Sequence, residues 1–467
     1  MEQKFLHRSV HYGIPLALTA VCVIASLADL YAFRVNDWDF SYFSVLPWNL
    51  GNGYGWHVPF HELDSGIPFY AHHWQPFALF LVPFLTWFDS PYTLSVLHGL
   101  ALGTWFFLLP LFIRQVYEED GRSDYLKTAL FWELVLFVYL PFLGAWRYQT
   151  HLTTLVSPAI FLAVLSLHRR RFVWACFWCI LLACGQERSS VAVFSVGMYA
   201  FLLLKQYRFG SCLCFASAAY FAGVIKVLFP FLRGGENYAF SGAIHPFYEI
   251  SKKIYFLLQY ILCTFCLPLA GKRAFLTALC SLPVLGIGLV SNRGPMYAFA
   301  HHYQDISAPF FLMSGVYGLL WIQKLSLWRR CSRKIILFCC VLLLALSFIA
   351  GRFSHPLVHL SFAVTDPRLE QYATLHDELK RLLDISRDKT LFVQSGIGPL
   401  VSLRENRYSL FAHNDLKRDY SGCYVAISHL CGVYSFENYE VLKNGLDKND
   451  TLELVSDSGV LRIYRGK

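Results

Sequence analysis

Charged side chains are scarce in this chain. Only 15% of its 467 residues are Asp, Glu, Lys or Arg, whereas 56% are hydrophobic and 17% are aromatic. A soluble globular protein carries about 25% charged residues, so this composition excludes that class and favours a protein that crosses a membrane several times. Long apolar runs, rather than short alternating segments, fill most of the chain, which predicts membrane helices and not a barrel.

Motifs for several reaction classes are missing. The sequence has no glycine-rich loop that cradles phosphates, no His-Glu-x-x-His metal motif and no nucleophile elbow. Cys263 and Cys266 have the spacing of a metal pair, but they lie in an apolar run without a second pair or a histidine nearby, so they are interpreted as small core residues. Energy for a reaction must therefore come with an activated substrate or from an ion gradient.

The positive residues indicate how the chain crosses the membrane. About a dozen apolar runs between Gly13 and Gly351 approach the roughly 20 residues that a span requires. From the middle of the chain onward, Lys and Arg recur after every second run, and short loops rich in them stay in the cytoplasm. This rule also accounts for the net charge of +9, so the charge indicates no nucleic-acid partner. Pro76 to Phe88 is too short to cross and is predicted to be interfacial or re-entrant. We expect about eleven transmembrane helices, with a cytoplasmic N-terminus and an outer C-terminus.

The chain divides into two parts by composition. Residues 1–352 form the predicted membrane domain, whose first outer loop covers residues 34–75. Residues 363–467 contain more charged residues than the membrane domain and are predicted to form a small exported α/β domain. Leucines at helical spacing predict a helix over 368–385, and strand-like segments lie at 390–394, 407–411, 423–427, 452–455 and 460–464.

This exported part contains Cys423 and Cys431. An oxidising compartment would permit a disulfide between them, but their positions in the sequence leave the paired and free states equally open.

Asp37 and Asp39 directly follow the first apolar run, where the chain leaves the membrane on its outer side. A carboxylate at this boundary can act as a general base, and the i, i+2 spacing puts both on the same side of an extended segment. Asp39 is the preferred base and Asp37 the second candidate. The alternative is that both acids cap a juxtamembrane helix that begins near Phe40.

Other polar residues fall on the same predicted outer side, beside helix ends. The histidines suit binding of phosphate oxygens or a metal, although a lone interfacial histidine also serves as a structural hydrogen-bonding group. An acid and an arginine at the outer end of a helix need partners, either each other or a phosphate, and a further loop arginine offers a planar fork for phosphate or is simply exposed. The candidate substrate-binding residues are His73, His151, Glu187, Arg188, Arg293 and His302.

Short motifs spread over most of the chain carry a family resemblance. They are the segment from Asp39 to Asn49 with Gly53 behind it, His73-Trp-Gln-Pro76, His151-Leu-Thr153, Gln186-Glu-Arg188, His302-Tyr303 and the segment from Pro399 to Tyr408. By these motifs the chain resembles the DUF2079 family of predicted bacterial membrane proteins, which is similar in layout to the GT-C superfamily of lipid-sugar-dependent glycosyltransferases. The chain departs from the family pattern where Ser44, Thr153 and Arg188 replace acids.

The resemblance implies a GT-C-like enzyme of a bacterial inner membrane. It would transfer a sugar from a polyprenyl-phosphate donor to a glycan, lipid or protein acceptor on the outer face, with no required cofactor. The replaced acids disfavour a divalent metal, because oxygen ligands would be missing. A membrane transporter or lipid flippase without transfer chemistry is the first alternative. A non-catalytic envelope assembly protein, whose exported domain binds a partner, is the second.

Overall fold

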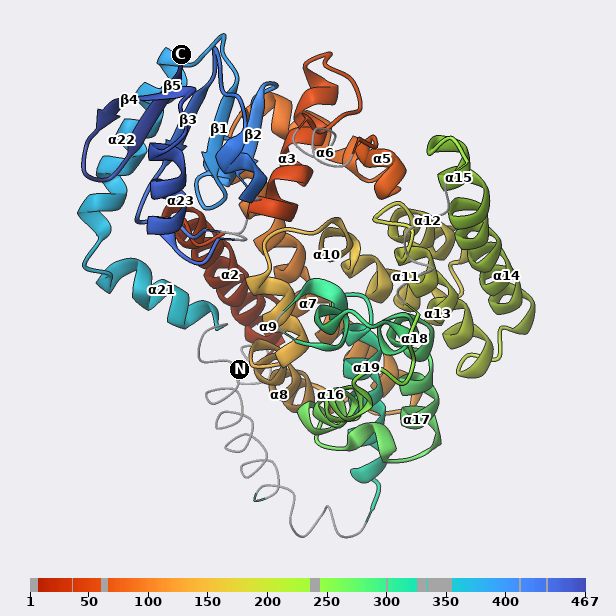
Figure 1. Ribbon diagram of the computed structural model, residues 1–467. Coiled ribbons are helices and arrows are strands. Elements are labelled where there is room, and N and C mark those ends of the chain that lie inside the picture. Colours follow the sequence, from red (N-terminus) through yellow and green to blue (C-terminus); the bar gives the residue numbers. More distant parts are fainter. Residues whose placement is uncertain are drawn as a thin grey trace.

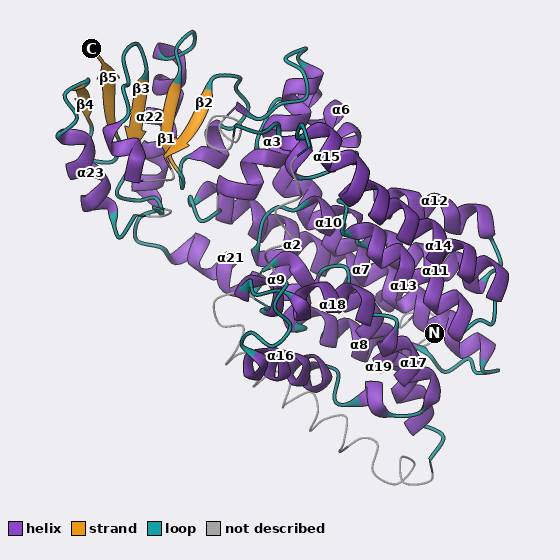
Figure 2. Ribbon diagram, turned by 45° about the vertical axis from the view of Figure 1, so that its right-hand side comes forward, coloured by secondary structure: helices purple, strands orange, loops and turns teal. Residues whose placement is uncertain are grey.

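The computed structural model describes residues 7–35, 37–59, 66–235, 244–299, 301–325, 334, 355–410, 413–433 and 436–467. Helices make up most of it, and a small sheet lies near the C-terminus (Figures 1 and 2). The expected last span, Ile335 to Gly351, lies outside the described residues.

The membrane domain consists of helices and short helical turns. Its α-helices are α2 (Ile14–Tyr31), α3 (Asp37–Gly51), α5 (Phe69–His72), α6 (Ala78–Phe88), α7 (Tyr92–Glu119), α8 (Leu126–Phe137), α9 (Leu140–Arg147), α10 (Leu152–Val156), α11 (Pro158–His168), α12 (Phe172–Ala183), α13 (Ser189–Leu202), α14 (Tyr207–Gly223), α15 (Phe229–Leu232), α16 (Ile250–Cys263), α17 (Lys272–Leu279), α18 (Leu282–Val290) and α19 (Ala308–Ile322). The short turns are η1 (Ser9–Gly13), η2 (Val224–Leu228), η4 (Leu267–Leu269), η5 (Gly294–Tyr297) and η6 (His302–Gln304).

Fewer helices meet the length of a span than the sequence led us to expect. Among the described residues, three are long and apolar enough to cross a membrane, namely Ser9–Tyr31, Tyr92–Glu119 and Tyr207–Leu232. Two bent pairs, α8 with α9 and α17 with α18, raise this number to five, with bends of 48° and 49°. Six further apolar helices have 10–17 residues. The expected eleven crossings are therefore not confirmed.

A proline explains where one apolar run breaks. The run from Tyr125 to Leu143 was expected as one helix, but α8 ends at Phe137 and α9 has Pro141 in its first turn. Proline lacks the backbone N–H and fits the first turn of a helix, so this break lies where proline is tolerated. The run that starts at Leu152 bends little by comparison, because Ser157, the single residue between α10 and α11, keeps right-handed helical angles.

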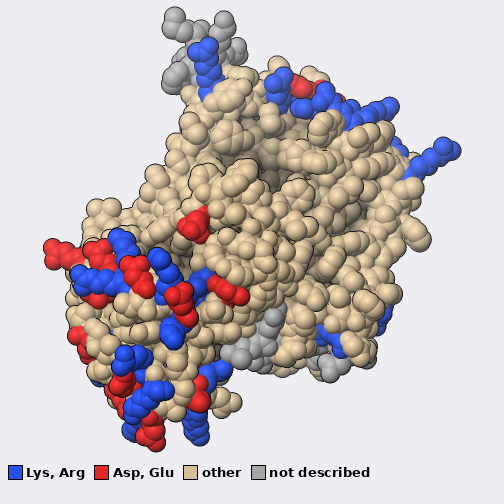
Figure 3. Space-filling model, turned by 90° about the horizontal axis from the view of Figure 1, so that it is seen from above, with Lys and Arg blue, Asp and Glu red and all other residues tan. Residues whose placement is uncertain are grey.

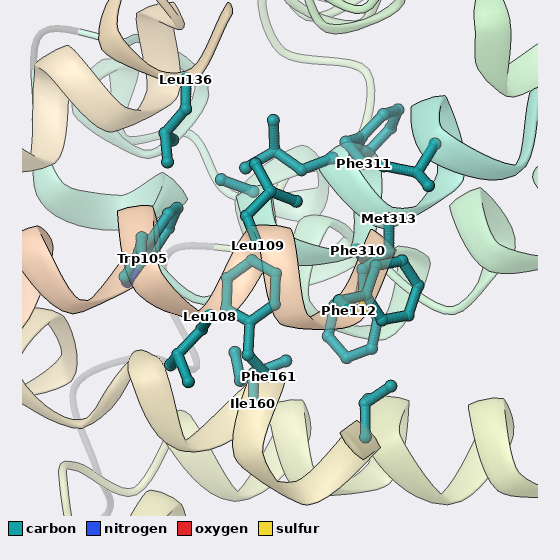
Figure 4. Close-up of a cluster of buried hydrophobic side chains, with 14 of the residues drawn as sticks. Trp105, Leu108, Leu109, Phe112, Leu136, Ile160, Phe161, Phe310, Phe311 and Met313 are labelled. Carbon is teal, nitrogen blue, oxygen red and sulfur yellow. The ribbon is translucent and has the colours of Figure 1, made fainter. Parts of the chain in front are cut away.

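Helix α7 passes through the main core of the membrane domain. Trp105 and Phe112 of this helix are fully buried, as are Phe161 of α11 and Phe310 of α19 (Figure 4). Helices α14 and α15 lie on the side of the molecule remote from the sheet and expose large apolar side chains such as Phe215 (Figure 1). This pattern suits a bundle whose outer helices face lipid.

The C-terminal domain confirms the expected α/β pattern. Its elements are α21 (Pro356–Thr365), α22 (Leu369–Ile385), β1 (Leu391–Gln394), η7 (Gly398–Val401), β2 (Arg407–Leu410), η8 (His413–Lys417), β3 (Tyr424–Ile427), α23 (Tyr439–Asp447), β4 (Leu452–Asp457) and β5 (Arg462–Gly466). The five strands have the order β2-β1-β3-β5-β4; β1 is parallel to β2 and β3, and β5 pairs antiparallel with β3 and β4. Every expected strand is present within two residues of its predicted start.

Helices α22 and α23 cover opposite faces of this sheet. Leu375 of α22 packs in the cluster on one face, and Leu442 of α23 packs in the cluster on the other. Cys431 belongs to the first cluster, whereas Cys423 packs against the second. The two thiols are free and lie on opposite faces, which is the physical reason that they do not form the disulfide left open by the sequence.

The C-terminal domain is packed on the membrane domain, and residues of the membrane domain enter one of its hydrophobic clusters. Ala32 and Phe33, just after α2, are buried in the same cluster as the inner face of α22. Arg34 pairs with Asp366 at 2.9 Å, and His376 Nε2 lies 2.9 Å from the carbonyl oxygen of Tyr31. Figure 3 shows Lys, Arg, Asp and Glu gathered over this domain, whereas uncharged atoms make up most of the remaining surface in that view.

Candidate functional site

Several helix ends meet beneath the C-terminal domain and bring together residues from distant parts of the sequence. Asp39 lies in the first turn of α3, His73 follows α5, His151 precedes α10, and His302 begins η6. The Gln186-Glu187-Arg188 segment joins α12 to α13. We call the set of Asp39, His73, His151, Glu187, Arg188, His302 and Asp305 the polar cluster.

Asp37 and Asp39 point to different places. Helix α3 begins at Asp37, so the predicted extended segment is wrong and both acids lie in the first helical turn. Residues two apart on a helix are separated by about 200° around its axis, which turns the two carboxylates in opposite directions. Asp37 is fully buried against Arg407 and Ser409 of the C-terminal domain, and no solvent reaches it. It is therefore placed as a structural ion-pair partner rather than as a second base.

Asp39 is half-buried and faces the polar cluster. Burial raises the pKa of Asp39 to about 6, and a hydrogen bond from Tyr148 together with the charges of His73 and Arg188 opposes this rise. A carboxyl group with a pKa near 6 is mostly ionised at pH 7 but still basic enough to accept a proton. This combination of access and basicity fits a general base.

His73 and Glu187 form one side of the cluster. The Nδ1 atom of His73 lies 3.1 Å from Oε1 of Glu187 and 2.8 Å from Nε2 of Gln186. The backbone N–H of Trp74 donates to Oε2 of Glu187 at 3.1 Å. Glu187 is buried, so these bonds provide the partners that an ionisable group at membrane depth requires.

Arg188 and Asp305 form the centre of the cluster. The guanidinium donates to Oε1 of Gln186 and Oγ1 of Thr153, both at 2.9 Å, and lies over the ring of Tyr303. Its Nη2 atom is 3.7 Å from Oδ1 of Asp305. The hydroxyl groups of Thr153 and Thr154 donate to Oδ2 of Asp305 at 2.5 and 2.8 Å. Arg188 is therefore held by protein groups on several sides.

His151 and His302 stack face to face. Their ring centroids are 3.8 Å apart and their planes differ by 9°. Burial, followed by the charge of Arg188, lowers the pKa of His151 well below its usual value. Burial and the neighbouring His151 do the same for the pKa of His302. The stacked rings are thus neutral at pH 7, so any contact they make to a phosphate oxygen would come from a neutral imidazole N–H.

Arg293 lies at the edge of the site. It is exposed before η5, and its positive charge reaches Tyr303, one neighbour of Asp39. Among the described residues, no group of three or more His, Cys, Asp or Glu side chains is arranged to hold a metal ion. Five of the six candidate substrate-binding residues thus enter the cluster, and Arg293 borders it.

The sequence interpretation missed two members of the site. Asp305 carries the same signal as Asp39, an acid at the boundary of an apolar helix, because α19 begins three residues later. Tyr148 hydrogen-bonds Asp39, yet only its position in a short outer loop distinguishes it from the other aromatic residues.

A family model for predicted membrane proteins of the DUF2079 type matches residues 29–418. The chain belongs to the DUF2079 family. The crystal structure of ArnT from Cupriavidus metallidurans bound to undecaprenyl phosphate is similar to this DUF2079 protein, with a TM-score of 0.56 and 11% identity over 96% of this chain and 97% of that chain. The chain therefore has a fold like that of ArnT. No curated protein sequence matches the chain.

Two departures from the DUF2079 pattern lie side by side in the structure. Thr153 and Arg188, which stand where the family resemblance suggests acids, contact each other at 2.9 Å and share Asp305 as a partner. An internal ion pair with two threonine hydroxyl groups thus occupies the place where further carboxylates would have stood.

Proposed function

We propose that this protein is a GT-C-type glycosyltransferase that moves a sugar from a polyprenyl-phosphate donor to an acceptor hydroxyl at the outer face of a membrane. The observation that carries the proposal is Asp39, a half-buried carboxylate with a raised pKa among residues from six helix ends. The ArnT-like fold supports the choice of a lipid phosphate as donor.

Asp39 would act on the acceptor. Its carboxylate takes the hydroxyl proton while the acceptor oxygen forms a bond to the anomeric carbon of the sugar. The bond between that carbon and the phosphate oxygen breaks, and the polyprenyl phosphate leaves with the electron pair. Tyr148 holds the carboxylate through its hydrogen bond, and the fixed charge of Arg188 stabilises the ionised form of Asp39.

A cavity beside Arg147 suits the lipid part of the donor. It has a volume of about 450 Å³ between α9, α16 and η5 and is lined by apolar side chains such as Leu143 and Phe256. Arg147 brings positive charge to the same cavity, whereas Lys252 in its lining forms an ion pair with Glu249. Arg147 directly precedes Tyr148, so a phosphate bound there would lie near the proposed base.

Helix α16 provides a route for the lipid chain. Large apolar residues on its outer face are exposed, including Ile254, Leu258 and Leu262. A helix with an exposed apolar face lies at the membrane boundary, where a polyprenyl chain is dissolved. The donor can therefore reach the cavity from the bilayer without crossing water.

The test compares lipids from cells lacking the protein with those from cells carrying wild type, Asp39→Asn or Asp89→Asn at matched expression. Asp89 is a matched control, because it is also a juxtamembrane aspartate but accepts a hydrogen bond from Trp48 outside the cluster. We expect one polyprenyl-phosphate sugar to accumulate without the protein and with Asp39→Asn, but not with Asp89→Asn. Identical lipid profiles in all four strains would refute sugar transfer and favour transport or assembly.

The donor cavity has its own test. Arg147→Gln should raise the KM for the donor roughly tenfold with little change in kcat, because a charge-assisted bond to phosphate is lost. Arg114→Gln serves as the control, because Arg114 is a half-exposed arginine of α7 that pairs with Glu118 of the same helix. Equal KM values in wild type and Arg147→Gln would place the donor elsewhere.

A further inference from the structure

A buried ion pair joins the first turn of α3 to the C-terminal domain. Asp37 accepts hydrogen bonds from Arg407 of β2, from Ser409 of the same strand and from Ser41 of its own helix. The side chains of both Asp37 and Arg407 have no exposed surface. Because charges are costly to bury unless they are paired, the two groups constrain each other strongly.

Close packing adds to this constraint. Gly398 of η7 lies against the pair, and a Cβ atom at this position would overlap the guanidinium of Arg407 and the carboxyl group of Asp37. Strand β2 and helix α3 lie side by side in both ribbon views (Figures 1 and 2). The start of α3 therefore has little freedom to shift against the sheet.

The same helical turn carries Asp39. While Asp37 faces the C-terminal domain, Asp39 faces Tyr148, His73, Arg188 and Tyr303, all of which belong to the membrane domain. The other end of α3 packs on α6, where Gly51 lies against Thr86. A movement of the first turn of α3 would thus shift Asp39 away from these groups of the membrane domain.

We propose that the C-terminal domain positions the general base, because the Asp37–Arg407 pair fixes the first turn of α3 and so holds Asp39 in the polar cluster. The inference rests on the proposed role of Asp39 in sugar transfer. Asp37 and Arg407 are positioning residues in this scheme, since neither reaches the cluster.

The experiment follows the protonation of Asp39 by infrared spectroscopy in the full-length protein reconstituted in lipid nanodiscs. The Asp39 signal is the difference between each protein and the same protein with Asp39→Asn, which removes contributions from Asp37 and all other carboxyl groups. In Arg407→Gln we expect the titration midpoint to fall by about one pH unit or more, towards that of an exposed aspartate, because the carboxyl group gains water.

Two further variants keep the result interpretable if Arg407→Gln folds poorly. The double variant Asp37→Asn/Arg407→Gln retains hydrogen-bonding side chains without an unpaired charge, so the Asp39 midpoint should return towards the wild-type value. Arg462→Gln is the matched control, since Arg462 is a largely buried arginine of β5 that pairs with Asp447 and Asp457 on the opposite side of the sheet from β2.

A midpoint that falls in Arg407→Gln and recovers in the double variant supports positioning. An unchanged midpoint in Arg407→Gln, or an equal fall in Arg462→Gln, overturns it. The infrared measurement requires no sugar donor. A lipid profile that is the same in wild type and Asp39→Asn would therefore refute the transfer reaction alone. An unchanged titration midpoint of Asp39 in Arg407→Gln would refute the positioning role alone.

Discussion

Replacing Gly398 by alanine should break the contact between the C-terminal domain and α3. The added Cβ atom would overlap both partners of the buried Asp37–Arg407 pair, so at least one of these fully buried side chains must shift away from the other. Separating a buried ion pair costs about 3–5 kcal/mol, and overpacking alone costs about 1–3 kcal/mol. We expect Gly398→Ala to lower the free energy of unfolding by about 3 kcal/mol or more.

The control is the same substitution at Gly432. This glycine is in the same domain, its backbone is outside the left-handed region, and no atom lies within 4 Å of the position that a Cβ would occupy. Gly→Ala at a compatible site stabilises a protein by about 0.4–1 kcal/mol, because the unfolded chain loses freedom. The two substitutions should therefore have effects of opposite sign.

Denaturant unfolding of the purified protein in detergent, followed by proteolysis of the C-terminal domain, measures both variants. Gly398→Ala should become susceptible to protease at lower denaturant concentration than wild type, and Gly432→Ala at equal or higher concentration. If Gly398→Ala were as resistant as Gly432→Ala, the tight contact among residues 37, 398 and 407 would not exist as described.

Three further predictions concern the polar cluster. The transfer rate should rise with pH through about 6 as Asp39 ionises. Any residual transfer rate in Asp39→Asn should not show this rise. The free energy of unfolding should fall as the pH drops below 6.5, the ordinary pKa of histidine. The reason is that both histidines bind protons in the unfolded chain, whereas the buried rings of His151 and His302 do not in the folded protein. Thermal unfolding should show a weaker pH dependence in His302→Asn. Arg188→Gln should destabilise the protein by about 3 kcal/mol because it leaves Asp305 buried without its cation, and Arg188→Gln/Asp305→Asn should recover most of that loss in denaturant unfolding.

The sequence predicted the C-terminal domain well because its signals are local. Short apolar segments mark the strands, and the leucines of residues 368–385 mark α22, so neither depends on distant contacts. The membrane helices were harder to delimit. The break at Pro141 shortens the helices within one continuous apolar run, and an average over the run does not show it.

The membership of the site was partly predictable for a topological reason. Short loops on one side of a membrane bundle must meet at one surface, so placing His73, His151, Glu187 and His302 on the outer side already brought them near each other. Local sequence patterns do not reveal a contact with a residue that is far away in the sequence. Arg407 lies 370 residues from Asp37, and its contact buries that acid away from the polar cluster.

The arrangement of charge divides the proposed reaction between two sides of the site. Arg188 is already bound to Asp305, Gln186 and Thr153, so its charge serves the protein's own carboxylates more than an incoming phosphate. Arg147 is exposed and lines the cavity of α9 and α16, where Lys252 pairs with Glu249. We therefore expect the donor phosphate to bind on that side and the acceptor hydroxyl to approach Asp39 from the other. Acceptor binding would then depend on α3, the helix that the C-terminal domain holds in place.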